Sequence, residues 1–211
     1  NINLDLMFGI PGQTSTQWQE SLRVTLALNP DHISAYCLTY EEDTEYFLRL
    51  SRGEFRPDES LDADLFEMTM DTLAEAGFES YEISNHTRPG RECLHNLAYW
   101  FGHDSLGLGP SAFSTVKNER WKNVSDTSAY IAHIQDGTDP VDFRETIDSA
   151  TRRVEQIAFS LRTNRGVPSH LLPVEKAAAL VANGLLRQES DRSHLTRAGQ
   201  MLADEVAASV I

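Results

Sequence analysis

The feature that most constrains the fold is the opening of the chain, NINLDLMFGIPGQT. Apolar residues alternate from Ile2 to Phe8, which predicts a strand, and GIPGQT then breaks that strand. Thr14 or Thr16 can cap the helix that follows, and residues 32–40, HISAYCLTY, predict a second strand. A strand, a helix and a strand in this order form the unit of a parallel sheet. The start of the chain therefore predicts an α/β fold.

The rest of the chain continues this alternation and then changes character. A polar connection is expected over residues 41–60, a helix from Leu61 to Ala76, and a strand over residues 78–84. Residues 86–115 are rich in Gly and Pro and predict a long functional loop. A short helix follows, capped by Asp126. The tail predicts helices around a short hairpin, a winged-helix-like pattern. We therefore expect two domains, residues 1–142 and 143–211.

The composition is that of an ordinary globular protein, with 40% hydrophobic and 24% charged residues. The two cysteines, Cys37 and Cys93, suggest no disulfide framework, which favours a reducing, cytoplasmic setting. No apolar run of ~18 residues and no signal peptide are visible. The sequence opens without Met inside a predicted buried strand. We therefore expect the chain to be the C-terminal part of a longer protein.

The charge of the chain bears on its partners. The formal net charge is −14, which disfavours binding to nucleic acid or to anionic lipid. Winged-helix patterns invite a DNA-binding hypothesis, but residues 168–211 hold four basic and five acidic side chains. A duplex binder needs cations to neutralise phosphates. We expect the tail to serve in packing or docking, with membrane contact only through partners.

Two candidate ligand contacts lie in the first strand and turn. GIPGQT lacks the Gly-Lys-Ser/Thr ending of a P-loop, but Gly9 and Gly12 would let a ligand approach the backbone. A plain strand-to-helix turn explains the same glycines. Asp5 lies in an apolar strand, where a buried carboxylate needs a partner. That partner could be a hydroxyl or amine of a bound nucleotide, or an arginine from the part of the protein that we expect to precede this chain, and the residues alone leave both open.

The stretch CLHNLAYW, residues 93–100, combines a thiol, an imidazole and two aromatic rings. Neither Cys93 with His95 nor His95 with His103 has the ligand spacing of a zinc site. A haem needs only one or two axial ligands and an apolar wall, so His95 among its apolar neighbours could serve. The alternative is that the aromatic side chains of this stretch pack together in a hydrophobic core. Spacing alone favours that alternative.

Four motifs together resemble one known family. NINLDLMFGIPGQT, HISAYCLTYEEDTEY, YEISNHTRPGRECLHNLAYW and SLGLGPSAFS resemble, in order and spacing, the oxygen-independent coproporphyrinogen III oxidase family of radical SAM proteins. The similarity covers nearly the whole chain, including the tail LTRAGQMLADEVA. It implies the C-terminal part of an incomplete six-stranded (β/α) barrel with a winged-helix-like region, so the chain would begin at the fifth barrel strand.

The resemblance also implies cofactors. Asp5, Gly9, Thr39 and Phe113 match positions that hold S-adenosylmethionine, with Phe113 near the adenine. The family binds a [4Fe-4S] cluster through CxxxCxxC, a motif that this chain does not contain. Cys37 and Cys93 cannot supply three thiolates, so the cluster ligands are expected outside this chain. We therefore assign no catalytic residue here, and the chain should not cleave the cofactor alone.

The family has two branches. One is the oxidase, which decarboxylates coproporphyrinogen III to protoporphyrinogen IX in porphyrin biosynthesis. The other is a haem chaperone that hands haem to acceptor haem proteins. The chaperone branch is more similar, because HNxxYW matches His95, Asn96, Tyr99 and Trp100. The resemblance implies that His95 contacts haem and its iron, whereas Cys93 gains no role. The oxidase is the alternative, and the oligomeric state stays open.

Overall fold

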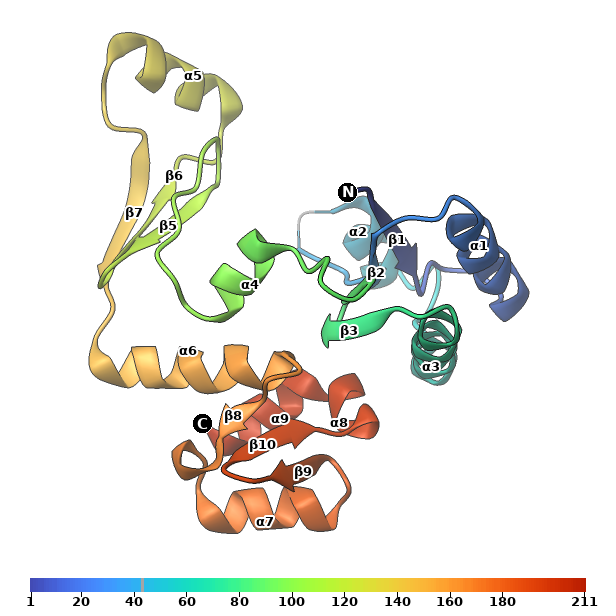
Figure 1. Cartoon of the computed structure of the whole chain (residues 1–211). Coiled ribbons are helices and arrows are strands. Elements are labelled where there is room, and N and C mark those ends of the chain that lie inside the picture. The colour runs from blue at the N-terminus through green and yellow to red at the C-terminus, as the bar shows by residue number, and fades with distance from the viewer. Residues whose placement is uncertain (43) are drawn as a thin grey trace. The chain divides into compact units, whose positions relative to one another are not determined.

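The computed structural model describes residues 1–42 and 44–211. The chain forms two compact units, Asn1–Glu92 and Cys93–Ile211, and each has its own sheets and buried residues (Figure 1). The division expected near Asp142 falls inside the second unit, within a strand. That division into domains stays a prediction.

Among the described residues, the first unit contains one four-stranded sheet with order β1-β2-β4-β3. Its elements are β1 (Asn3–Phe8), α1 (Ser15–Ala27), β2 (His32–Cys37), α2 (Glu45–Ser51), α3 (Glu59–Glu75), β3 (Glu79–Glu82) and β4 (Asn85–Thr87). β1 and β2 are parallel and are joined by α1, whereas β4 is antiparallel to both of its neighbours. The strand–helix–strand unit predicted at the start of the chain is therefore confirmed.

The first helix begins where its sequence predicts. The Thr14 side chain accepts a hydrogen bond from the Gln17 amide, and the Gln17 side chain accepts one from the Thr14 amide, a complete capping box. α1 and α3 then bury their apolar stripes with the sheet. The buried hydrophobic cluster consists of Phe8, Trp18, Leu22, Ile33, Ala35, Leu65, Leu73 and Phe78. Burial of these side chains is what stabilises the first unit.

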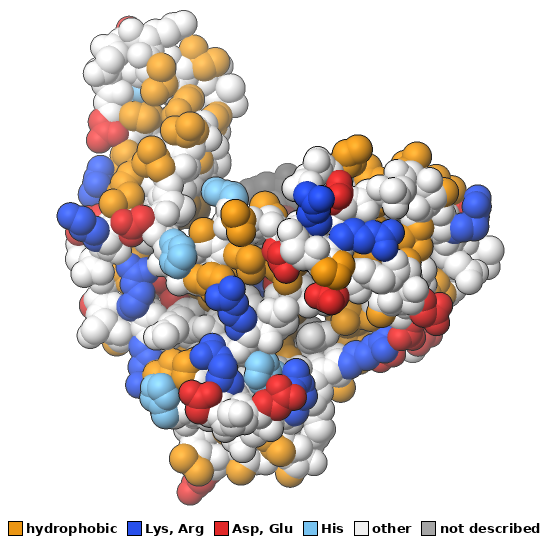
Figure 2. All heavy atoms as spheres, in the orientation of Figure 1, with side chains coloured by type: hydrophobic (Ala, Val, Ile, Leu, Met, Phe, Trp, Pro, Cys, Tyr) orange, Lys and Arg blue, Asp and Glu red, His pale blue; other side chains and the backbone are white. Residues whose placement is uncertain are grey.

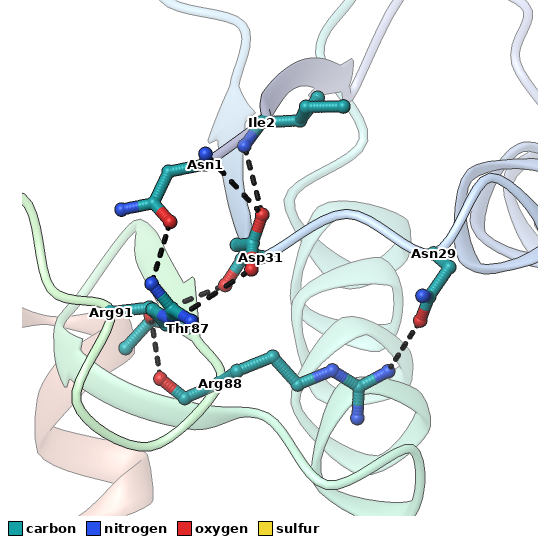
Figure 3. A network of polar contacts seen from close by, with 7 residues as sticks. All are labelled: Asn1, Ile2, Asn29, Asp31, Thr87, Arg88 and Arg91. Atoms are coloured by element: carbon teal, nitrogen blue, oxygen red, sulfur yellow. Dashed lines mark hydrogen bonds and ion pairs between the residues drawn. The ribbon is translucent and has the colours of Figure 1, made fainter.

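Asp31 connects the start of β1 with the end of β4 (Figure 3). One of its carboxylate oxygens accepts a hydrogen bond from the Ile2 amide at 3.0 Å, and its main-chain oxygen accepts one from the Arg88 amide at 2.9 Å. Arg91 forms an ion pair with the other carboxylate oxygen at 3.9 Å. The segment that ends α1 thus also aligns the strands of the sheet.

Two expectations for this unit were wrong. Residues 41–60 contain α2, because Thr44 accepts a hydrogen bond from the Phe47 amide and starts a helix inside the polar connection. The single strand expected over residues 78–84 is instead β3 alone, followed by β4, with an irregular register between Ser80 and Glu82. β4 reads Asn-His-Thr and is fully buried. Its polar sequence carries no alternation that could reveal a strand.

The first half of the second unit is a helix followed by a three-stranded antiparallel sheet of order β5-β6-β7. The elements are α4 (Leu94–Trp100), β5 (Phe113–Val116), β6 (Glu119–Asn123), α5 (Thr127–Asp136) and β7 (Val141–Thr146). Asp126 caps α5, as predicted, and Gly137 ends the helix with a φ of 67°. The prediction of a long loop over residues 86–115 was wrong in part, because these residues include most of β4, all of α4 and most of β5.

The tail forms a second sheet of order β8-β10-β9, covered by helices. Its elements are α6 (Ser149–Arg162), β8 (Val167–Pro168), the 3-10 helix η1 (Ser169–Leu171), α7 (Val174–Ala182), β9 (Leu186–Glu189), β10 (Arg192–Leu195), α8 (Arg197–Met201) and α9 (Ala203–Val210). The hairpin between β9 and β10 confirms the predicted helix–hairpin–helix pattern. No helix in the part that the structure describes is both long and apolar enough to span a bilayer.

Candidate functional site

The stretch CLHNLAYW is a helix rather than a loop. Cys93 is the N-cap residue of α4, and its side chain makes no capping hydrogen bond. His95 lies in the first turn and is exposed, and the structure gives its imidazole no hydrogen-bond partner among the described residues. Leu94 beside it is 78% exposed. An uncommitted imidazole next to an exposed apolar side chain is available to a ligand.

The aromatic residues of the same helix have a different role. The ring centres of Tyr99 and Trp100 lie 5.5 Å and 5.8 Å from that of Phe159 on α6. The guanidinium of Arg162 lies 5.3 Å from the centre of the Trp100 ring. These contacts hold α4 against α6. The aromatic rings therefore pack against α6, as predicted by the alternative in which this stretch belongs to a core. His95 takes no part in this packing.

A cavity of about 260 Å³ opens beside this aromatic cluster, within the second unit. It is lined by Tyr99, Gly102, His103, Ser105, Phe113, Thr115, Arg120, Arg152, Glu155 and Phe159. Its walls therefore come from α4 and the segment after it, from β5 and β6, and from α6. The structure thus brings Phe113, the predicted adenine contact, together with Tyr99 of the CLHNLAYW helix.

The sheet face beside the cavity combines exposed aromatic rings with charged side chains. Phe113, Lys122 and Phe143 are cross-strand partners, so their side chains share one face of the β5–β7 sheet. Phe113 is 53% exposed and Phe143 is 44% exposed. In Figure 2 hydrophobic side chains form a band over the part of the second unit that holds α5 and this sheet. The cavity therefore opens beside a surface that is apolar around Phe113 and Phe143 and charged at Lys122.

Arg120 is the charged centre of the cavity wall. Its guanidinium donates to Glu145 at 3.0 Å, to Glu155, and to the Thr115 hydroxyl at 3.4 Å. Burial opposes the charge of Arg120, but the hydrogen bonds and charges of Glu155 and then Glu145 outweigh burial and raise its pKa. Arg120 therefore pairs with both acidic side chains beside the cavity, and its three donor nitrogens are occupied.

The other predicted cofactor contacts lie in the first unit. Asp5 on β1 is exposed rather than buried, because only Leu4, Leu6 and Phe8 face the packed side of the sheet. Its carboxylate accepts a hydrogen bond from the Asn3 side chain at 2.7 Å. The expectation of a buried carboxylate was therefore wrong. Because the Asp5 carboxylate stays in contact with water, it needs no buried partner to offset a cost of desolvation. Its side chain is open to a ligand.

Thr39 follows the end of β2. Its hydroxyl is exposed and donates to the Glu41 carboxylate at 3.3 Å. A ligand hydroxyl or amine could replace this weak surface contact without leaving a buried group unpaired.

Contacts within the first unit require a glycine at position 9. Its φ is 73°, and a Cβ at this position would lie 2.8 Å from Oδ1 of Asp62 and 3.1 Å from Sγ of Cys37. A Cβ on Gly12, whose φ is 82°, would meet no atom within 4 Å. The tight approach at Gly9 is therefore made by α3 and β2, and this contact explains the glycine without any ligand.

A polar network on the sheet was missed from the sequence. The ring nitrogens of His32 lie 2.7 Å from Oδ1 of Asn3 and 2.9 Å from the hydroxyl of Tyr81. Burial lowers the pKa of His32, although the charge of Asp5 opposes this shift. The signal was present, because the alternation in β1 and β2 places Asn3 and Asp5 on the same face as His32 and Ser34.

No three metal-binding side chains lie together among the described residues. Burial and the charge of Asp62 raise the pKa of the Cys37 thiol to about 11, although part of the residue reaches the surface. A thiol with such a pKa is a poor metal ligand, because the thiolate is the binding form. The two cysteines of this chain therefore do not fit an iron–sulfur cluster.

Known proteins are similar to this chain in fold and in sequence. No family model matches the chain. The coproporphyrinogen III oxidase HemN from Escherichia coli, described as a radical SAM enzyme, superposes with a TM-score of 0.78 at 18% identity, over 99% of this chain and 54% of that protein. The fold is therefore that of the matching part of a radical SAM protein, as the resemblance predicts.

The sequence comparisons identify the branch. The heme chaperone HemW of Mycobacterium tuberculosis (strain CDC 1551 / Oshkosh) is 36% identical over 215 residues, which cover 100% of this chain and 55% of that protein. The heme chaperone HemW of Bacillus subtilis is 30% identical over 220 residues, with 98% and 58% coverage. The chain spans about half the length of the curated relatives it matches. It belongs to the HemW family of radical SAM proteins.

Proposed function

We propose that the protein containing this chain binds haem through His95 and transfers it to acceptor haem proteins. The relatives that match along the whole chain carry the name heme chaperone. The observation that carries the proposal is the exposed and uncommitted imidazole of His95 on α4. An imidazole nitrogen is the usual axial ligand of haem iron.

The surroundings of His95 suit a flat apolar cargo. Exposed apolar side chains lie on both sides of it along the chain, on α4 and in the next segment: Leu94, Tyr99, Leu106 and Leu108 are between 52% and 83% exposed. Isolated exposed apolar residues are common, but several within one short stretch indicate a binding surface. A ligand held by one exposed side chain on such a surface can also leave it, which is what transfer to an acceptor requires.

We further propose that Asp5, Gly9 and Thr39 contribute to an S-adenosylmethionine site and that Phe113 contacts the adenine. The exposed carboxylate of Asp5 and hydroxyl of Thr39 can accept and donate hydrogen bonds to a nucleoside. Gly9 shapes the turn rather than contacting the ligand through a side chain. When bound with a [4Fe-4S] cluster, this cofactor supplies radical chemistry. The two cysteines of this chain do not fit the cluster, so its ligands would come from outside the chain.

The same fold supports a second candidate, the oxidase reaction, because the structural neighbour is a coproporphyrinogen III oxidase. Product analysis with coproporphyrinogen III separates the two functions. We expect the full-length protein with its cluster to release no protoporphyrinogen IX. Turnover to that product would end the chaperone proposal.

Haem titration tests the assignment of His95. We expect the full-length protein to give a haem Soret band that His95→Ala weakens or shifts, because the substitution removes the iron ligand. Affinity should fall by about tenfold or more if one coordinate bond is lost. Absorbance titration with ferric haem measures both quantities.

His170→Ala is the matched control, because His170 is an exposed histidine in η1 of the same unit. It should leave the band and the affinity unchanged. An unchanged spectrum in His95→Ala would reject His95 as the ligand, and a wild-type protein that binds no haem would reject the function.

A further inference from the structure

We propose that the cavity beside Tyr99 is a subsite for a carboxylate side chain of the tetrapyrrole, with Arg152 as its cationic partner. This inference rests on the proposed haem binding at His95 and adds to it a residue that selects the acidic edge of the cargo. It concerns only side chains of the second unit, from α4, the β5–β7 sheet and α6.

The position of the cavity follows from the geometry of α4. His95 and Tyr99 are four residues apart, so they lie on one face of the helix. Tyr99 lines the cavity. Tyr99, which forms one wall of the cavity, therefore lies about one helical turn, roughly 5.4 Å along the axis, from His95. Haem carries its two carboxylates at the edge of a ring that extends further than this from the iron. A haem bound at His95 can thus place an edge over the cavity.

The side chains that line the cavity have the mixed apolar and polar character needed to bind the carboxylate edge of a tetrapyrrole. The rings of Tyr99, Phe113 and Phe159 provide apolar walls, and the polar side chains lie among them. A tetrapyrrole edge has the same character, since apolar ring atoms end in a short chain with a carboxylate. Sites for small molecules are typically apolar with a few placed polar groups.

Arg152 is the cation best placed to bind that carboxylate. Arg120 also lines the cavity, but Glu145, Glu155 and Thr115 occupy its three donor nitrogens. Arg152 donates from one nitrogen to the carbonyl of Lys117, and it has no acidic partner among the described residues. The carboxylate of Glu155, which shares the cavity, is compensated by Arg120. A partly buried arginine without a carboxylate partner is available for a bidentate pair with an anionic ligand.

The test compares haem with haem dimethyl ester in the full-length protein. Arg152→Gln should weaken haem binding by about ten- to a hundredfold, because a charge-assisted hydrogen bond is lost. The Soret maximum should not move, since the iron ligand is intact. The dimethyl ester has no carboxylate, so wild type and Arg152→Gln should bind it equally.

Arg153→Gln is the matched control, because Arg153 is the next residue on α6, donates to the carbonyl of Leu171 and does not line the cavity. It should bind haem like wild type. Arg152→Lys keeps the charge, so it should retain part of the preference for haem over the ester even if Arg152→Gln folds poorly.

The outcomes separate this inference from the function on which it rests. Equal loss of haem and ester in Arg152→Gln, or wild-type haem affinity in that variant, would reject the subsite while His95 keeps its role. A wild-type protein that binds neither compound would reject both.

Discussion

His86 on β4 is a buried histidine that makes the stability of the first unit depend on pH. It is 3% exposed, and burial, with a smaller contribution from His32, lowers its pKa from 6.5 to about 4. Between these values the unfolded chain binds a proton that the folded chain does not bind. The free energy of unfolding therefore falls as the pH decreases from 6.5 to 4, by roughly 3 kcal/mol. Urea unfolding followed by hydrogen exchange of first-unit amides measures this loss.

His86→Gln removes the titrating group and should flatten this dependence. His170→Gln is the control, because this exposed histidine lies in the second unit, so the slope measured on the first unit should not change. A slope in His86→Gln equal to that of wild type would show that other groups cause the acid sensitivity.

At the scale of elements, one hydrogen bond joins α1 to α3 inside the core. The indole N–H of Trp18 donates to the hydroxyl of Thr69 at 2.9 Å, and that hydroxyl donates to the carbonyl of Leu65. Thr69→Val keeps the shape of the side chain but leaves the buried indole N–H unpaired. We expect a loss of about 1–3 kcal/mol in the free energy of unfolding, measured by urea denaturation.

Thr69→Ser is the matched variant, since it retains the hydroxyl and loses only a methyl group. It should be destabilised less than Thr69→Val. The reverse order would show that packing of the methyl, rather than the hydrogen bond, joins the two helices.

The elements that sequence patterns identified are those whose signals are local. Thr14 with Gln17 starts α1, and Asp126 starts α5. Both helix starts can be predicted from the sequence because a cap involves only a few neighbouring residues. α4 was missed because Cys93 caps it poorly and Gly and Pro surround it. The packing of Tyr99 against Phe159 on α6 stabilises the helix. A contact between residues 60 positions apart produces no pattern in the local sequence from which the helix could be predicted.

At the scale of the whole molecule, charge predicts which partners the chain avoids. The net charge is −14, and residues 168–211 hold four basic and five acidic side chains. On the face seen in Figure 2, basic and acidic side chains intermingle over the tail rather than forming a basic patch. We expect no binding of a labelled DNA duplex at about 0.15 M salt, because no excess of cations neutralises its phosphates. Fluorescence anisotropy measures this.

A protein with a basic tail of known DNA-binding activity serves as the positive control in the same buffer. Saturable binding by this chain at that salt concentration would contradict the charge argument and revive a nucleic-acid role for the winged-helix-like tail.

The sequence by itself determined the α/β class, the parallel β1–α1–β2 unit, the hairpin of the tail and the family, since each depends on short-range periodicity, on capping or on motifs in register. It also singled out His95. It misjudged Asp5, because an apolar strand does not reveal which of its faces is covered.

Only the tertiary structure decided what surrounds these residues. It placed Phe113 beside Tyr99, explained Gly9 by Asp62 and Cys37, and distinguished Arg152 from the fully occupied Arg120. Each of these facts depends on side chains that are distant in sequence. Because close packing and charge pairing act through space, residues far apart along the chain set the accessibility and charge of each site.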